Sequence, residues 1–395
     1  MRSLFLPTLG AFVLLALPAC REDRESPTAP EIRAQPATSL ATTLVFRQLT
    51  AGNETSCGVT ANNVAYCWGW NSDGQIGDGT TNNAVRPVAV SGSLRFRQVI
   101  AGFADACGVT TESRAYCWGG NFQGQLGDGT TVRRLRPAPV VGSLAFVQIS
   151  VGPDFTCGVT IDRLAYCWGS NFWGQLGDGT RTQRTRPTLV LGNHKWSAVS
   201  AGGFHTCGLT TGSVVYCWGR NKEGQLGDST AYPSEVRASR VVGAQQFRQV
   251  SAGHNHTCAV TLGQRVFCWG SGQEGALGNG KATSSSWPQL VAGGLLFAHV
   301  SAGTLYTCGK SASSQFYCWG WNSNGQLGDG TTISRLAPGP VTGGHAFVQV
   351  WAGNFHTCGA TATGDGYCWG LNDVGELGDG TTTERHKPVR VLGPM

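Results

Sequence analysis

A unit of about 50 residues occurs seven times in the chain, and this repetition constrains the fold more than any other feature. Each unit reads roughly F-x-Q-V-x-A-G, then C-x-x-T, then Y-C-W-G-x-N-x-x-G-Q-L-G-D-G-T-T, and ends near P-x-x-V. The period is 50 residues, except for one spacing of 51 in the fourth unit. The units fill residues 46–395 of a predicted propeller domain that spans 45–395, and they begin at Phe46, Phe96, Phe146, Trp196, Phe247, Phe297 and Phe347.

Each unit contains four short β-like runs separated by turn residues, without a sustained helical period. Four strands per unit, repeated seven times, predict an all-β protein: a seven-bladed β-propeller with one repeat per blade. One unit cannot cover its own apolar faces, whereas a closed ring can. A solenoid would need atypical capping units at its ends, and these terminal units look like the others. Packing between blades is predicted for Trp68, Trp118, Trp168, Trp218, Trp269, Trp319 and Trp369.

Fourteen of the fifteen cysteines form seven pairs at the spacing C-x9-C. Each pair flanks a predicted β-hairpin, and a hairpin centred near Asn62 places Cys57 opposite Cys67 at a distance that suits a disulfide. Zinc is the alternative, but zinc sites combine closer C-x2–4-C pairs four at a time. Disulfides are therefore predicted between Cys57 and Cys67, Cys107 and Cys117, Cys157 and Cys167, Cys207 and Cys217, Cys258 and Cys268, Cys308 and Cys318, and Cys358 and Cys368.

The first twenty residues, "MRSLFLPTLGAFVLLALPAC", predict an export signal peptide because a basic residue precedes an apolar run too short to span a membrane. Their "LPAC" ending resembles a bacterial lipobox, in which Cys20 would be lipidated; plain cleavage and secretion is the alternative. Lipidation would also explain the unpaired Cys20. Residues 21–44 are polar and proline-containing, and they are predicted to be a flexible linker. The chain is thus expected at the cell envelope, held to the membrane by the lipid alone.

The pattern "AGxxHTCGLT…YCWGxNxxGQLGDGT" resembles the repeat of the regulator-of-chromosome-condensation family over residues 46–395. The resemblance implies a seven-bladed propeller, here in an exported bacterial lipoprotein. It also implies that the histidine before the first cysteine is structural. Founding members of that family promote guanine-nucleotide exchange on a nuclear GTPase and dock on chromatin, but export and paired cysteines disfavour such roles here. Similarity extends to secreted bacterial propellers that inhibit β-lactamases, although no inhibitor contact can be matched.

The glycine-rich "GQLGDGTT" stretch is predicted to be a turn of the blade rather than a ligand site. It lacks the lysine of a phosphate-binding loop and the acid spacing of a calcium loop, so no cofactor or metal is expected. In a turn, its acid would accept hydrogen bonds from nearby backbone N–H groups, and asparagine can do the same. The residues at this position are Asp78, Asp128, Asp178, Asp228, Asn279, Asp329 and Asp379.

Two variable sets inside the constant frame are candidates for function. One precedes the first cysteine of each pair and contains Asp105, Phe155, His205, His256, Tyr306 and His356. Its three histidines have no fixed acidic or cysteine partner, which makes a metal site the weaker interpretation. The other set follows Trp-Gly and is the candidate protein-binding face; partial burial against neighbouring loops is its alternative interpretation. This face comprises Trp70, Phe122, Phe172, Trp173, Arg220, Lys222 and Trp321.

Basic residues cluster in units two and three, where they form either a patch for anionic partners or a solvated face. The cluster consists of Arg133, Arg134, Arg136, Arg181, Arg184 and Arg186. The net charge of +6 is otherwise scattered, so no nucleic-acid partner is expected. No GxSxG or HExxH motif occurs, and an enzyme is not predicted.

The sequence therefore predicts a monomeric, exported, lipid-anchored propeller that binds a protein at the cell envelope without catalysing a reaction. The first alternative is a propeller that binds cell-surface glycans, with the same aromatic residues stacked on sugars. A hydrolase with an unrecognised site is a further alternative.

Overall fold

The structure, a computed structural model, describes residues 43–230 and 232–394. The predicted signal peptide (1–20), the predicted lipidation site Cys20 and almost all of the predicted linker (21–44) lie outside the described residues. No helix in the described part of the chain is long and apolar enough to cross a membrane.

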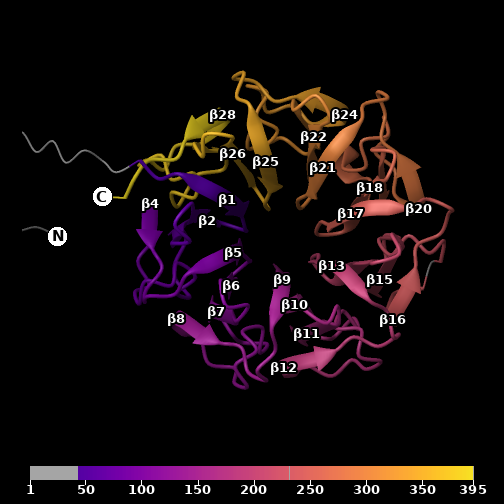
Figure 1. Cartoon of the computed structure of the whole chain (residues 1–395). Helices are drawn as coiled ribbons and strands as arrows, with labels where there is room; N and C mark the ends of the chain where they lie inside the picture. Colours follow the sequence, from indigo (N-terminus) through magenta and orange to yellow (C-terminus); the bar gives the residue numbers. More distant parts are fainter. Residues whose placement is uncertain (1–42, 231, 395) are drawn as a thin grey trace, which may run out of the picture. The chain divides into compact units, whose positions relative to one another are not determined.

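Seven antiparallel sheets of four strands each form a ring, with consecutive blades side by side (Figure 1). In every sheet the strands are paired in chain order, so one sequence repeat makes one complete blade. The first strand of each blade lies nearest the centre of the ring and the fourth lies on its outside (Figure 1). The predicted all-β, seven-bladed propeller is therefore confirmed.

The innermost strands are β1 (Phe46–Ala51), β5 (Phe96–Ala101), β9 (Phe146–Val151), β13 (Trp196–Ala201), β17 (Phe247–Ala252), β21 (Phe297–Ala302) and β25 (Phe347–Ala352). The second strands are β2 (Thr55–Thr60), β6 (Asp105–Thr110), β10 (Phe155–Thr160), β14 (His205–Thr210), β18 (His256–Thr261), β22 (Tyr306–Ser311) and β26 (His356–Thr361).

The third strands are β3 (Ala65–Gly69), β7 (Ala115–Gly119), β11 (Ala165–Gly169), β15 (Val215–Arg220), β19 (Val266–Gly270), β23 (Phe316–Gly320) and β27 (Gly366–Gly370). The outer strands are β4 (Ala84–Ala89), β8 (Arg134–Pro139), β12 (Arg184–Leu189), β16 (Ser234–Arg240), β20 (Ser285–Leu290), β24 (Arg335–Pro340) and β28 (Arg385–Arg390). The fifth blade also contains a single 3-10 turn, η1 (Gln273–Gly275).

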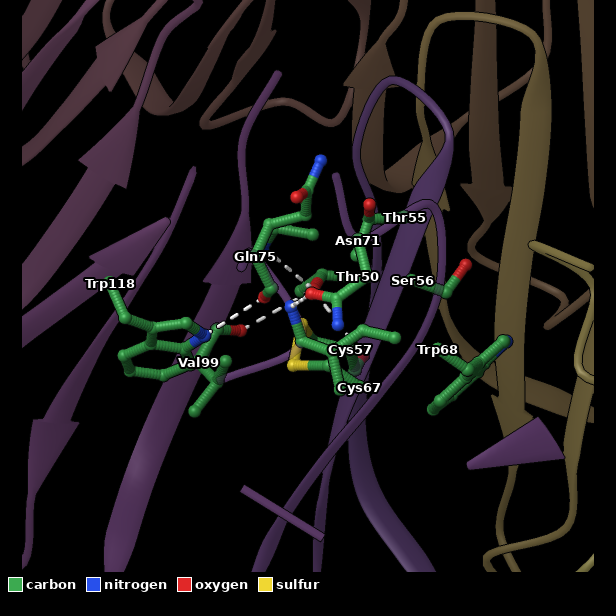
Figure 2. Close-up of a disulfide and its surroundings, with 12 residues drawn as sticks. Thr50, Thr55, Ser56, Cys57, Cys67, Trp68, Asn71, Gln75, Val99 and Trp118 are labelled. Atoms are coloured by element: carbon green, nitrogen blue, oxygen red, sulfur yellow. Dashed lines mark hydrogen bonds between the residues drawn. A yellow bond between two sulfur atoms is a disulfide. The ribbon is translucent and has the colours of Figure 1, made fainter. Parts of the chain in front are cut away.

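A disulfide joins the second and third strands of every blade, as predicted. Cys57 lies directly opposite Cys67 in the β2–β3 register, and the same pairing recurs in the other blades. The paired Cα atoms are 4.0–4.1 Å apart, which is the short distance found between opposed residues that do not exchange hydrogen bonds. All fourteen paired cysteines are fully buried in the core. Figure 2 shows the Cys57–Cys67 bridge of the first blade.

The recurrent tryptophan packs between blades, as predicted. The indole nitrogen of Trp118 in the second blade donates to the carbonyl oxygen of Gln75 in the first blade, at 2.9 Å (Figure 2). The seam between the last and first blades uses the same bond, from Trp68 to the carbonyl oxygen of Glu376, at 3.0 Å. The ring therefore closes through the contacts that join its other blades.

The inner strands are joined by a second repeated contact. The side-chain amide of Gln148 accepts from Val199 N at 2.9 Å and donates to Val199 O at 2.7 Å, so it adds two hydrogen bonds between adjacent blades. Gln98 and Gln249 make the same pair of bonds to Ile149 and Val300. The inner strands line a central channel of about 370 Å³, into whose wall Trp351 also packs.

Strand direction divides the loops between two faces of the ring. The turns between first and second strands lie on the same face as the long loops between third and fourth strands, because the strands alternate in direction. We call this the upper face; in the first blade it contains residues 52–54 and 70–83. The lower face contains the turns between second and third strands and the connections to the next blade, such as residues 61–64 and 90–95.

We expect Gly227→Ala to destabilise the protein more than Gly280→Ala. Both glycines have positive φ, 68° and 83°, so each alanine costs about 1–2 kcal/mol in backbone strain. A Cβ on Gly227 would also lie 2.6 Å from the indole nitrogen of Trp269, whereas one on Gly280 meets no atom within 4 Å. Displacing that indole should add about 1–3 kcal/mol. Urea unfolding of both variants measures the difference, and equal losses would contradict the clash.

Candidate functional site

The seven residues of the predicted binding face all lie on the upper face, at or just after the ends of third strands. The structure divides them by exposure. Phe122, Phe172 and Lys222 occupy the same position of successive repeats and are exposed, with Phe122 at 67 % and Phe172 at 70 %. Trp70, Trp173, Arg220 and Trp321 are partly buried. The first three therefore supply the most accessible surface of the set.

Arg220 is the centre of an aromatic cluster that spans the third, fourth and fifth blades. Its guanidinium carbon lies 5.7 Å from the ring centroid of Trp173 and 5.9 Å from that of Phe204, distances at which a cation is attracted to an aromatic face. Phe172 packs edge-on against Trp173 at 5.0 Å. His254 packs edge-on against Phe204 at 5.2 Å. We call Phe172, Trp173, Phe204, Arg220 and His254 the Arg220 cluster.

Polar contacts fix the position of Arg220. It donates to the side-chain oxygen of Asn255 in the next blade at 2.6 Å and pairs with Glu223 at 3.4 Å. Burial lowers the pKa of His254, and the nearby charge of Arg220 lowers it further, so this imidazole is neutral at pH 7. The cluster therefore presents one fixed cation framed by aromatic rings, which is an arrangement enriched at protein interfaces.

Sequence reasoning missed Phe204 and His254. Both lie in turns between first and second strands, whereas the predicted face was drawn only from the loops after the third strands. The sequence feature that could have pointed to Phe204 is the variability of this turn. The other units have Glu54, Ala104, Asp154, Asn255, Leu305 and Phe355 at its position. A similar contact between the two kinds of loop joins Trp321 to Phe355 at 5.7 Å.

The histidines before the first cysteines bridge neighbouring blades. The Nε2 atom of His205 lies 2.8 Å from the hydroxyl of Thr257, and this hydroxyl donates its own proton to the carbonyl oxygen of Gln225. His205 must therefore be the donor, as a neutral imidazole protonated at Nε2. His256 is placed in the same way against Thr307, which donates to Ala276 O.

The closing seam repeats this arrangement, because Nε2 of His356 lies 2.8 Å from the hydroxyl of Ser56, which donates to Glu376 O. Burial lowers the pKa of His205 and His356 to about 3 and that of His256 to about 4. Tyr306 occupies the same position in the sixth blade and donates to His356 O at 2.7 Å. Among the residues that the structure describes, no three His, Cys, Asp or Glu side chains gather closely enough to hold a metal ion.

The other two members of this set, Phe155 and Asp105, are also fully buried. Burial raises the pKa of Asp105 well above its usual value, and the charge of Asp154 adds to the effect. Neither carboxyl oxygen of Asp105 has a hydrogen-bond partner within the described residues.

The acids of the "GDGT" stretch act as turn residues, as predicted. The carboxylate of Asp128 accepts from Thr130 N at 2.9 Å, and Asn279 accepts likewise from Lys281 N at 3.1 Å. Asp128 also pairs with Arg134 at 2.7 Å. Burial would raise the pKa of Asp128, but hydrogen bonds from Thr130 and Arg134 outweigh burial and lower it.

The arginines of the predicted basic cluster fall into two groups, those paired with an aspartate and those bonded to neutral groups. Arg134 and Arg184 are paired with Asp128 and Asp178, so they belong to the blade frame. Arg133, Arg136 and Arg181 make hydrogen bonds to neutral groups, namely Ser72 O and the hydroxyls of Ser91 and Ser234. The cluster is therefore not one continuous patch of free charge.

Acidic groups gather on the upper face at the seam between the seventh and first blades. Glu376 is fully buried; its Oε2 atom accepts from Val374 N at 3.1 Å, and its Oε1 atom has no partner within the described residues. Burial raises the pKa of Glu376 to about 7, with smaller contributions from the charges of Glu54 and Asp373. Burial and Asp373 also raise the pKa of Glu54. Five other blades have glutamine at the position of Glu376.

We expect Glu376→Gln to stabilise the protein at pH 8 but not at pH 4. The folded state raises the pKa of Glu376 above its ordinary value of 4.5, so the wild type loses stability as the pH rises from about 4.5 to about 7. Glutamine removes this loss, which is on the order of 3 kcal/mol. Urea unfolding between pH 4 and 8 measures it. The reciprocal variant, Gln326→Glu, should acquire the same pH dependence, and a constant difference at all pH values would contradict the expectation.

The ring of seven four-stranded sheets, built one repeat per blade and closed by the same seam contacts throughout, defines a seven-bladed β-propeller. Its sequence matches the profile of the regulator of chromosome condensation (RCC1) repeat at residues 62–103, 112–159, 164–209, 214–260, 264–309, 313–360 and 363–395. A second profile of this repeat matches residues 46–75, 146–175, 196–225, 247–276 and 347–376. The chain belongs to the RCC1 repeat family. No curated protein matches the chain in sequence.

Solved structures share the fold at low sequence identity. Human WBSCR16 is 19 % identical with a TM-score of 0.75, over 83 % of this chain and 93 % of that one. Prp20p from Saccharomyces cerevisiae, described with its binding properties to Gsp1p and histones, is 18 % identical with a TM-score of 0.70, over 78 % and 80 %. The CRINKLY WD40 ectodomain of the Arabidopsis thaliana receptor kinase ACR4 is 22 % identical with a TM-score of 0.53, over 82 % and 94 %. These similarities establish the fold alone.

Proposed function

We propose that this protein is an exported, lipid-anchored scaffold that binds a protein partner at the cell envelope through its upper face, without catalysing a reaction. The observation that carries the proposal is the Arg220 cluster, together with the exposed rings of Phe122 and Phe172 on one face of a rigid ring. Two exposed aromatic rings on the same face as a partly buried arginine–aromatic cluster supply the kind of anchors that protein interfaces favour.

Export is supported by the seven disulfides. Such bonds form and persist in oxidising compartments outside the cytosol. The predicted signal peptide and the lipobox-like ending at Cys20 agree with this, although they lie outside the described residues. The same compartment argues against histone binding of the kind described for Prp20p, and the ACR4 ectodomain offers a precedent for this fold outside a cell.

A binding role without catalysis is supported by what the recurrent histidines and the acids of the turns do. His205, His256, His356 and Tyr306 join neighbouring blades through hydrogen bonds and are fully buried. The acids of the "GDGT" turns accept hydrogen bonds from the same turns. These groups are therefore committed to the frame, and the loops of the upper face are left for recognition.

The test is partner capture by cross-linking on intact cells that display the full chain, followed by mass spectrometry. The double variant Phe122→Ala, Phe172→Ala removes two exposed rings from the upper face. The matched control Ile161→Ala, Leu262→Ala removes two exposed apolar side chains, 57 % and 54 % exposed, from turns of the lower face. We expect the first variant to lose the captured protein and the control to keep it.

Equal capture by both variants would reject the upper face as the binding surface. If cell-wall glycans in solution displace the captured material, the aromatic rings bind sugars, and the glycan-binding alternative replaces the protein-binding one. Turnover in a panel of hydrolase substrates by the purified chain would reject the non-catalytic role.

A further inference from the structure

Two arginines from adjacent blades line the lower end of the central channel. Arg47 and Arg97 are the second residues of β1 and β5, at the end where the inner strands begin. Arg47 donates from Nη2 to the carbonyl oxygen of Phe96 at 2.9 Å, so its guanidinium group lies beside the backbone of the second blade, next to Arg97. Arg97 makes the equivalent bond to the carbonyl oxygen of Phe146 in the third blade. These bonds hold both cations over adjacent seams.

Neither arginine has a carboxylate partner in the described part of the chain. The same chain pairs Arg134, Arg184 and Arg335 with aspartates at 2.6–2.8 Å. At the lower mouth, by contrast, burial and the neighbouring charge of Arg47 both lower the pKa of Arg97. The Nε atom of Arg97 is buried and has no hydrogen-bond partner among the described residues. Within the described residues, two neighbouring cations therefore lack a counter-charge, and one buried N–H donor lacks an acceptor.

A cavity of about 320 Å³ lies between these groups, lined by Arg47, Gln48, Arg97, Gln98, Val147 and Gln148. The side-chain oxygen and nitrogen of both Gln98 and Gln148 already make hydrogen bonds to the next blade. The oxygen of Gln48 accepts from Val99 N at 3.0 Å, and its amide nitrogen makes no hydrogen bond within the described residues. The groups left to meet a ligand are thus donors, and two of the three carry positive charge.

We propose that the lower mouth of the channel, between the first and third blades, binds the oxyanion group of a small molecule between Arg47 and Arg97. A guanidinium group offers parallel N–H donors that match the two oxygens of a carboxylate or a phosphate. The anion would supply the missing counter-charge for both arginines. This site lies on the opposite side of the ring from the proposed protein-binding face, and it does not depend on that function.

The test is isothermal titration of the folded full chain at low salt with two probes, inorganic phosphate and citrate. We expect saturable binding of one molecule per chain, with Arg47→Gln and Arg97→Gln each weakening it at least tenfold. Comparison of the two probes separates a phosphate site from a carboxylate site. The matched control is Arg248→Gln, which removes the same charge from the second residue of β17, outside the cavity lining.

Absence of saturable binding of either probe to the wild type would overturn the proposal. Equal weakening by Arg248→Gln would also overturn it, because the effect would then reflect net charge rather than a site. Arg47 is exposed, so Arg47→Gln is expected to fold even if Arg97→Gln does not. Near-UV circular dichroism of each variant checks this before titration.

Discussion

Replacing Trp218 by alanine is expected to lower the free energy of unfolding by about 4 kcal/mol. The side chain is fully buried at the seam between the third and fourth blades, and its indole nitrogen donates to Gln175 O at 2.9 Å. Truncating a buried tryptophan typically costs about 3–5 kcal/mol, because packing is lost and a cavity remains. The carbonyl oxygen of Gln175 would keep only its bond from Thr206. Equilibrium urea unfolding measures the loss.

The control for this substitution is Trp287→Ala. Trp287 lies on the outer strand β20 and is 55 % exposed, so it has the same side chain without the seam. Its loss should change the free energy of unfolding by less than about 1 kcal/mol. Similar losses for the two variants would mean that the tryptophans at the seams do not hold the blades together.

The second expectation is that the fully reduced chain does not fold. Each bridge closes a loop with a sequence separation of 10, which in the chain-entropy model contributes about 2–3 kcal/mol. Seven such losses together match or exceed the total stability of about 5–15 kcal/mol that is usual for a folded protein. Because all the bridges are buried, the experiment reduces the chain in denaturant, removes the denaturant with reductant present, and records near-UV circular dichroism.

A single-bridge variant separates this effect from general damage. Cys207→Ala with Cys217→Ala removes one bridge and leaves six, so we expect a folded protein with about 3 kcal/mol less stability. Recovery of the native near-UV spectrum by the fully reduced chain would show that burial between blades suffices without the bridges.

The fold could be predicted from the sequence because its determinants recur at fixed positions. The spacing of Cys57 and Cys67 defines a hairpin register, and seven copies of that hairpin define the number of blades. Trp118 could be assigned to the seam from its recurrence alone. Its acceptor, the carbonyl oxygen of Gln75, could not, because a backbone acceptor leaves no pattern in the sequence.

The candidate site could be predicted only in part, because functional contacts join different kinds of loop. Arg220 and Trp173 are predicted because they follow Trp-Gly, but Phe204 contacts Arg220 from a turn that is sixteen positions earlier in the same repeat. Likewise, Arg47 and Arg97 occupy the second position of an inner strand, a position that holds Val147 and Ser197 in the next two blades. The repeat pattern alone does not show that the two arginines line one cavity, because this depends on which blades are neighbours.

The equivalence of all seven seams has a consequence for how such rings evolve. A duplicated or deleted stretch of one whole unit inserts or removes a blade together with the donors and acceptors that its neighbours require, such as the Trp68–Glu376 and Trp118–Gln75 bonds. The exposed loop positions, such as Phe122 and Phe172, can then diverge independently in each copy, since these side chains make none of the seam bonds. Inheritance by whole units would thus let recognition change from blade to blade while the frame stays constant.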